Sequence, residues 1–176
     1  PAVHLFTQSG GKLSFDEINK VFLPNKYPSD QLSVGSCNGD FKINEIINNL
    51  STNLKEFLKI DKTDFDNLSI ECEGENSKRN IWLLPSDKPI GKTKPFVDYQ
   101  NDATAKDIKL ALREGFRSIE HVKRYTTTGM GTDQGKLGNM HALGIISETA
   151  GAKMGELGTT TFRPPYTPLT FGTIVG

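Results

Sequence analysis

The segment that most constrains the fold is a glycine- and threonine-rich stretch at 121–139, HVKRYTTTGMGTDQGKLGN. It holds four glycines, three consecutive threonines and a Lys-Arg pair within nineteen residues. The apolar periodicity of the flanking segments predicts a helix on each side. Glycine-rich turns with nearby hydroxyls and cations expose backbone N–H groups that can bind an anion. Since no nucleophile stands beside a base here, the stretch predicts a binding or interface loop without a catalytic residue.

Cations, hydroxyls and a glycine of this stretch are the candidates for contact with a phosphate or an acidic partner surface. The alternative for the Lys-Arg pair is a solvated position on the outer face of a short helix. A phosphate-binding loop of the GxxxxGK[ST] type is excluded, because the glycine spacing is one residue short and Leu137 stands where a hydroxyl is required. The two flanking histidines have no cysteine near them, so no zinc site is predicted. The candidate residues are Lys123, Arg124, Thr127, Thr128, Gly129 and Lys136.

Apolar periodicity and capping residues predict three short helices around this loop, which together make a small helical module. The first begins at a capping box formed by Thr104 and Asp107, in which the side chain of each bonds to the backbone N–H of the other. Asn139 is expected to cap the third helix, because asparagine is favoured at the N-cap position. The expected helices are 104–115, 118–125 and 139–151.

An amphipathic helix over 43–58 is the clearest element of the chain. Its apolar residues fall at helical spacing with polar residues between them, so one face must be buried. The turn GSCNGD at 35–40 precedes it in the layout by which helix N-terminal amides bind an anion, with a tight turn that binds nothing as the alternative. The other expectations for the N-terminal part are strands at 2–6 and 32–34, a helical turn at 16–20 and a loop at 24–28.

Two segments differ in character from the helical ones. Strands at 68–72 and 81–84 flank GENSKRN and predict a hairpin. The stretch PSDKPIGKTKP at 85–95 has the proline, glycine and lysine content of a linker, and a domain boundary is expected there. The Pro-Pro pair near the C-terminus forbids helix, so 158–176 is expected to be extended.

Charge and composition exclude several classes of function. The 21 basic and 21 acidic side chains balance, which argues against general binding of nucleic acid or a membrane surface. No apolar run approaches the roughly 20 residues that span a bilayer, and the N-terminus lacks the features of a signal peptide. Cys37 and Cys72 are expected to be free thiols of a cytoplasmic protein, with a disulfide as the alternative. The missing initial methionine and the apolar end TFGTIVG predict an excerpt from a longer polypeptide.

Several long stretches resemble the alpha subunits of heterotetrameric sarcosine oxidases. They are DYQNDATAKDIKLALREGFRSIEHVKRYTTTGMGTDQGK at 98–136 and GTTTFRPPYTPLTFGTIVG at 158–176. VHLFTQSGGKLSFDE at 3–17 and VGSCNGDFKI at 34–43 are similar to the end of the dinucleotide-binding region of the same subunits. The resemblance covers nearly the whole chain and is weakest across 50–90.

The resemblance implies a subunit with an NAD-binding region, a small helical module and a folate-binding domain. In this family sarcosine is oxidised at a flavin of the beta subunit, and electrons pass to FMN at the interface between the alpha and beta subunits. The expected fold class is α+β: a partial dinucleotide-binding α/β region, the helical module and an extended C-terminal segment. The expected divisions are 1–60 for the end of the NAD-binding domain, 61–95 for a hairpin and linker, 96–157 for the helical module and 158–176 for the extended lead into the folate-binding domain.

The helical module also resembles the iron–sulfur domain of bacterioferritin-associated ferredoxins. This resemblance places the four cluster-ligand positions on Asp98, Gln100, Asp133 and Gly138. An iron–sulfur cluster requires thiolate ligands, and none of the four residues is a cysteine. No iron–sulfur cluster and no other metal is therefore predicted.

The same family resemblance assigns roles to the candidate residues. Leu5 and Thr7 match positions that contact NAD, whereas His4 beside them is expected to be a core or edge histidine rather than a catalytic one. The loop at 123–136 takes the place where a cluster would face the interfacial flavin, so it is expected to contact FMN phosphate or the beta subunit. The expected partners are the beta subunit and the other subunits of the oxidase. The alternatives are a subunit of a related amine or amino-acid dehydrogenase and a non-catalytic interaction module.

Overall fold

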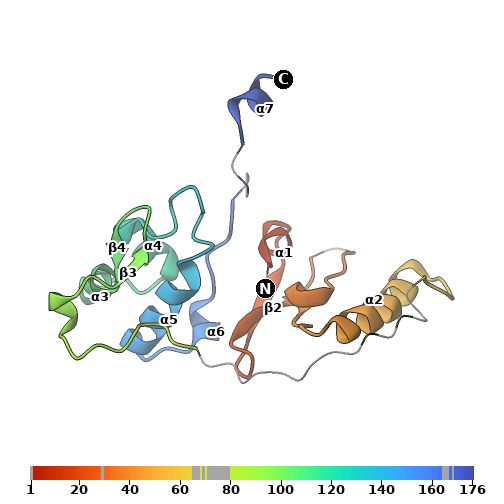
Figure 1. The fold of residues 1–176 in the computed structure, drawn as a ribbon, viewed down its shortest axis with the longest axis horizontal. Coiled ribbons are helices and arrows are strands. Elements are labelled where there is room, and N and C mark those ends of the chain that lie inside the picture. The colour runs from red at the N-terminus through yellow and green to blue at the C-terminus, as the bar shows by residue number, and fades with distance from the viewer. Residues whose placement is uncertain are drawn as a thin grey trace. The chain divides into compact units, whose positions relative to one another are not determined.

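Short helices and two small antiparallel sheets make up the described part of the chain, so the fold is broadly α+β (Figure 1). The computed structural model describes residues 2–28, 30–64, 68, 70, 80–163, 167 and 169–176. The chain divides into two units, Pro1–Arg79 and Asn80–Gly176.

The first unit begins with helix α1 (His4–Gln8), so the strand predicted at 2–6 is wrong. Within α1 the Thr7 hydroxyl donates to the carbonyl of His4 at 2.9 Å. Phe6 is the buried residue of the helix, and its ring fills the space into which a Cβ at Gly11 would project. An apolar run of five residues fits one helical turn with a single buried side chain as well as it fits a strand.

A hairpin of β1 (Lys12–Asp16) and β2 (Val21–Lys26) follows, where the sequence predicted a helical turn and a loop. The helical turn predicted at 16–20 is wrong, and the loop predicted at 24–28 is wrong over 24–26, because β2 continues to Lys26. The rings of Phe15 and Phe22 lie across from each other with centroids 4.9 Å apart, and Phe22 is buried. Pro24 is accommodated because a two-stranded sheet leaves every strand with a free edge.

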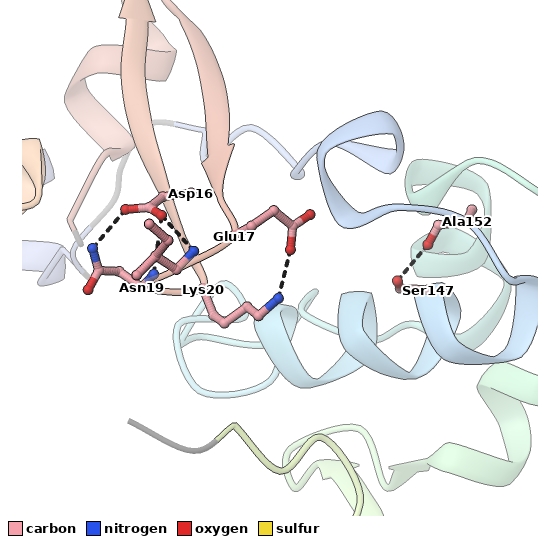
Figure 2. A network of polar contacts seen from close by, with 7 residues as sticks. Asp16, Glu17, Asn19, Lys20, Ser147 and Ala152 are labelled. Carbon is pink, nitrogen blue, oxygen red and sulfur yellow. Dashed lines mark hydrogen bonds and ion pairs between the residues drawn. The ribbon is translucent and has the colours of Figure 1, made fainter. Parts of the chain in front are cut away.

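The hairpin turn is closed by the side chain of Asp16, as Figure 2 shows. Its Oδ1 accepts hydrogen bonds from the backbone N–H groups of Ile18 at 2.8 Å and Asn19 at 3.2 Å. The side-chain amide of Asn19 donates to Asp16 Oδ2 at 2.8 Å, and Lys20 pairs with Glu17 at 2.7 Å. An aspartate that bonds to the backbone two and three residues later is a common turn former.

Helix α2 (Ile43–Leu58) confirms the amphipathic helix over 43–58. A 3-10 helix, η1 (Gly35–Asn38), lies before it, and no strand forms at 32–34, which corrects that prediction. Within the first unit as described, Ser51 is the buried residue of α2. Its apolar side chains are half-buried or exposed, and Ile43, Phe57 and Leu58 are exposed.

The second unit opens with the segment 80–95, where η2 (Ile90–Lys92) is the regular element described. The predicted strand at 81–84 does not form, and most of 68–72 lies outside the described residues. Trp82 instead lies against helix α5 (Asn139–Ala150), where its ring occupies the space beside Gly144.

The helical module confirms the three helices predicted around the loop. Strands β3 (Phe96–Asp98) and β4 (Ala103–Thr104) pair antiparallel and lead into α3 (Ala105–Arg113), which packs against α4 (Ile119–Thr126) and α5 (Figure 1). The predicted capping box is present: Thr104 N donates to Asp107 Oδ2 at 2.8 Å, and Asp107 N donates to Thr104 Oγ1 at 3.4 Å. The largest fully buried side chains of this unit are Ile108, Val122, Leu143, Ile145 and Ile146.

Two predictions at the end of the chain need correction. Gly138, not Asn139, is the N-cap residue of α5, and no side-chain cap bond is made there. After α6 (Met154–Leu157), the segment expected to be extended contains a short helix, α7 (Phe171–Val175), whose first turn is capped by Thr170. The Pro-Pro pair precedes this helix and therefore does not forbid it. Within the described ranges, none of the helices is both long and apolar enough to cross a bilayer.

Candidate functional site

The predicted binding segment forms a loop at 127–138 between α4 and α5, here called the threonine–glycine loop. It lies against the β3–β4 turn at 99–102, which meets it through side-chain hydrogen bonds. The helices on both sides of the loop, α4 and α5, pack against α3. The two ends of the loop are thus held by the core of the unit.

The hydroxyls of the three consecutive threonines form hydrogen bonds at the end of α4. Thr126 Oγ1 donates to the carbonyl of Val122 at 2.8 Å and lies 2.7 Å from Thr128 Oγ1. Thr126 and Thr128 are both buried. Thr127 ends the helix in the left-handed conformation, with φ of 59°, and its hydroxyl donates to the carbonyl of Thr126 at 2.6 Å. The hydroxyls of Thr126 and Thr128 therefore support the loop from within the protein, whereas Thr127 is exposed.

The candidate cations differ in their surroundings. Arg124 is exposed and pairs with Glu120, one helical turn earlier, at 3.3 Å. Lys123 is half-buried on the same helix, and Lys136 is exposed on the loop. An exposed ion pair of this kind contributes little stability, about 0.3–0.5 kcal/mol, so Arg124 can exchange Glu120 for another anion at low cost.

Asp98, at the end of β3, is the buried charge that the sequence did not single out as a loop contact. Its Oδ2 accepts the backbone N–H of Gly129 at 2.7 Å, and its Oδ1 accepts those of Gln100 at 2.8 Å and Asn101 at 3.0 Å. Burial raises the pKa of Asp98, but the bonds from Gly129, Asn101 and Gln100 together hold that pKa below its usual value. Asp98 is therefore ionised at neutral pH and bonded to the loop backbone.

Gln100 makes a second connection at the surface. Its Nε2 and Oε1 lie 2.9 Å and 3.1 Å from the hydroxyl of Thr132, and Oε1 also accepts the N–H of Asp133 at 3.4 Å. A Cβ at Gly131 would project onto the Gln100 side chain. Glycine at 131 is what allows the two segments to approach this closely.

Asn139 fills the inside of the loop. Its side-chain amide donates to the buried hydroxyl of Thr160 at 3.1 Å. The same amide occupies the space into which a Cβ at Gly129 or Gly135 would project, and both glycines have positive φ, +72° and +77°. Position, backbone angle and space all require glycine there.

Known proteins resemble the chain over its whole length and over this module in particular. A family model described as the sarcosine oxidase A3 domain matches residues 92–176. Sarcosine oxidase subunit alpha of Rhizobium meliloti (strain 1021) is 52% identical over 104 residues, a match that takes in 59% of this chain and 10% of that protein. Sarcosine oxidase subunit alpha of Corynebacterium sp. (strain P-1) is 34% identical over 185 residues, with 100% of this chain and 19% of that protein covered.

The chain belongs to the sarcosine oxidase alpha subunit family. It spans less than a fifth of the length of these curated alpha subunits. Among solved structures, the crystal structure of L-proline dehydrogenase from P. horikoshii is similar in fold, with a TM-score of 0.65 and 24% identity. That match covers 98% of this chain and 36% of the dehydrogenase chain.

The four positions aligned with cluster ligands do not fit an iron–sulfur cluster. Asp98 is occupied by backbone N–H donors, and Gln100 by Thr132. A Cβ at Gly138 would lie 2.5 Å from the carbonyl oxygen of Val97, so no ligand side chain has room there. Within the described residues, no group of three or more His, Cys, Asp or Glu side chains is placed to hold a metal ion.

The remaining candidates, Leu5 and Thr7, lie on α1 in the first unit. Leu5 is 69% exposed, and the Thr7 hydroxyl is bonded to His4. The sequence singled out the loop and these two positions as candidates, and it did not predict that Asp98, Gln100 and Asn139 contact the loop. A local signal was present for the turn bonds of Asp98, because aspartate at the end of a strand often bonds to the backbone two and three residues on. That signal does not predict its bond to Gly129.

Proposed function

We propose that this chain is part of the alpha subunit of a sarcosine oxidase and supports the oxidative demethylation of sarcosine without supplying a catalytic residue. The observation that carries the proposal is the 52% identity to the Rhizobium alpha subunit, together with the A3-domain match at 92–176, which includes the whole threonine–glycine loop. We place the chain in a cytoplasmic enzyme of several subunits.

The threonine–glycine loop and the end of α4 are proposed to brace the interfacial FMN and the beta subunit. The supporting observations are an exposed arginine that forms a surface ion pair with Glu120 and a loop with exposed side chains. Met130 and Leu137, 55% and 75% exposed, add apolar surface of the kind found in protein interfaces. The residues proposed for direct contact are Lys123, Arg124, Thr127 and Lys136. Thr128 and Gly129 are buried, and their proposed role is to hold the loop in shape beneath those contacts.

The first unit is proposed to help bind NAD through Leu5 and Thr7. The exposed side chain of Leu5 could pack against a flat ring of the nucleotide. Thr7 already donates its hydroxyl proton to His4, so it would act toward NAD as an acceptor. The proposal assigns the first unit a share of the site and leaves phosphate binding to other parts of the alpha subunit.

Flavin retention in the assembled enzyme tests the proposed role of the second unit. The alpha subunit carrying Lys123→Ala and Arg124→Ala would be co-expressed with the beta subunit, and the flavins of the purified complex measured by visible spectrum. The matched control is Lys106→Ala with Arg113→Ala, which removes the same charge from exposed positions on α3. We expect the first pair to lose one flavin and the control to keep both. Retention of both flavins by the first pair would mean that Lys123 and Arg124 lie on a solvated helix face and do not help to hold a flavin.

A further inference from the structure

The β3–β4 turn reaches the threonine–glycine loop across a long separation in sequence. Asp98 and Gly129 are 31 residues apart, and Gln100 and Thr132 are 32 apart. We propose that Asp98 and Gln100 are positioning residues. Their hydrogen bonds to the threonine–glycine loop, here called the clasp, fix the orientation of the exposed side chains of the loop. The inference rests on the proposed function for what the loop contacts, whereas the clasp itself stands on the contacts of these two residues.

The inner half of the clasp is a buried charge bonded to backbone. In the part of the chain that the structure describes, Asp98 forms no ion pair with a lysine or arginine. Its charge is balanced by N–H donors, of which Gly129 N belongs to the loop at 2.7 Å. A buried carboxylate held by N–H groups resists displacement, because each donor that moves away leaves charge unsatisfied. The Gly129 peptide is therefore fixed to the end of β3.

The outer half of the clasp lies at the surface. The Gln100 amide contacts both the hydroxyl of Thr132 and the backbone of Asp133. The Asn101 side-chain amide adds a bond to the carbonyl of Thr127 at 3.2 Å. Bonds from Asp98, Gln100 and Asn101 thus reach the loop at 127, 129, 132 and 133.

The clasp holds the part of the loop backbone that carries several exposed side chains. Met130 lies between the two points of attachment, and Lys136 and Leu137 follow the second. Tyr99, 75% exposed, is carried by the clasping turn itself. Moving the turn would therefore move these side chains together, which is what a positioning role requires.

Amide hydrogen exchange in the intact chain tests the clasp directly. The variants are Asp98→Asn, Gln100→Ala and, as a control of equal charge change, Asp102→Asn at an exposed position with φ of +52° that asparagine tolerates. Asp98→Asn replaces one acceptor oxygen by a donor, so we expect exchange across 127–135 to rise about tenfold or more, with α3 and α5 still protected. Gln100→Ala should raise exchange at Asp133 alone, because the Asp133 N–H is the loop amide bonded to Gln100, and Asp102→Asn should change nothing.

Each other result overturns the clasp. Unchanged exchange at Gly129 in Asp98→Asn would mean that the carboxylate does not hold the loop. Loss of protection in α3 and α5 as well would mean that Asp98 stabilises the whole second unit and does not act on the loop alone. A spectroscopic signature adds a second measure: the Gly129 amide proton resonance should move as Asp98 is protonated, and should not move in Asp98→Asn.

Flavin retention separates failure of the clasp from failure of the proposed function. A loop that loosens in Asp98→Asn while the assembled enzyme keeps both flavins would leave the clasp standing and contradict the bracing role. A loop that stays protected in Asp98→Asn contradicts the clasp whatever the flavins do.

Discussion

Asp98 combines burial with a full negative charge, and its effect on stability depends on pH. Because its pKa in the folded chain is lower than its usual value, its bonds stabilise the second unit above the pKa of an unfolded aspartate, about 3.9. That contribution is lost as the pH falls through the lower, folded pKa. The residue is thus a stabilising group at neutral pH and an acid-sensitive one.

Asp98→Asn is expected to lower the free energy of unfolding of the second unit by about 1–3 kcal/mol at pH 7, since asparagine leaves buried donors unpaired. The difference from the wild type should shrink as the pH falls below about 4. Urea unfolding followed by the fluorescence of Trp82, the single tryptophan, measures it. Asp102→Asn is the control, and an equal loss at pH 7 and at pH 3 would contradict the assignment.

Gly138→Ala is expected to destabilise the second unit by about 1–3 kcal/mol, the usual cost of forcing an extra methyl into a packed site. The added Cβ would lie 2.5 Å from the backbone oxygen of Val97, and a backbone atom cannot turn away as a side chain can. Gly91→Ala is the matched control, because its Cβ would meet nothing within 4 Å. Equal stability of the two variants in urea unfolding would show that β3 can shift to make room.

At the level of elements, the beginnings of α3 and α4 offer a direct comparison. Thr104→Ala removes one partner of a complete capping box and should cost about 1 kcal/mol. Ser118→Ala, at the N-cap of α4, should cost much less, because Ser118 makes no side-chain cap bond. Thermal or urea unfolding of both variants checks the difference. Equal costs would mean that α4 is capped in solution by a bond not seen here.

The contact of the segment 80–95 with α5 can be measured by the fluorescence of Trp82. Gly144→Ala places a Cβ against the Trp82 ring, which should be displaced into solvent. The expected result is a red-shifted Trp82 emission with the helices retained in the circular dichroism spectrum. Gly91→Ala again serves as the control, and an unshifted emission would show that the ring slides along α5 without leaving it.

The success of sequence reasoning varied among elements for physical reasons. The helices α2 to α5 were predicted because each carries enough turns for its apolar period or caps to be recognised. The hairpin of β1 and β2 was missed because its strands are short and Pro24 marks a loop more often than a strand. In the candidate site, the loop was found from its own composition. Its anchors, Asp98 and Gln100, were not, since partners more than 30 residues away leave no local pattern.

At the scale of the whole molecule, the two units differ in how much apolar side chain they bury. In the first unit, the buried hydrophobic residues described are Phe6 and Phe22, whereas the second unit has a helical core. Because burial of apolar surface is the main favourable term in folding, the first unit should be the less stable of the two.

Thermal unfolding is therefore expected to occur in two steps. The first unit should melt at the lower temperature with a change in circular dichroism and little change in Trp82 fluorescence, since Trp82 belongs to the second unit. The second step should appear in both signals. A single transition that coincides by the two probes would show that the units unfold together.

The close approach of Gln100 to Gly131 has a consequence for sequence change among relatives of this chain. A side chain added at 131 would collide with the amide at 100, and a shorter residue at 100 would leave room for it. A substitution at either position is therefore accommodated more easily when the other position changes with it. Correlated substitution at 100 and 131, which are distant in sequence, is the trace that this contact would leave during evolution.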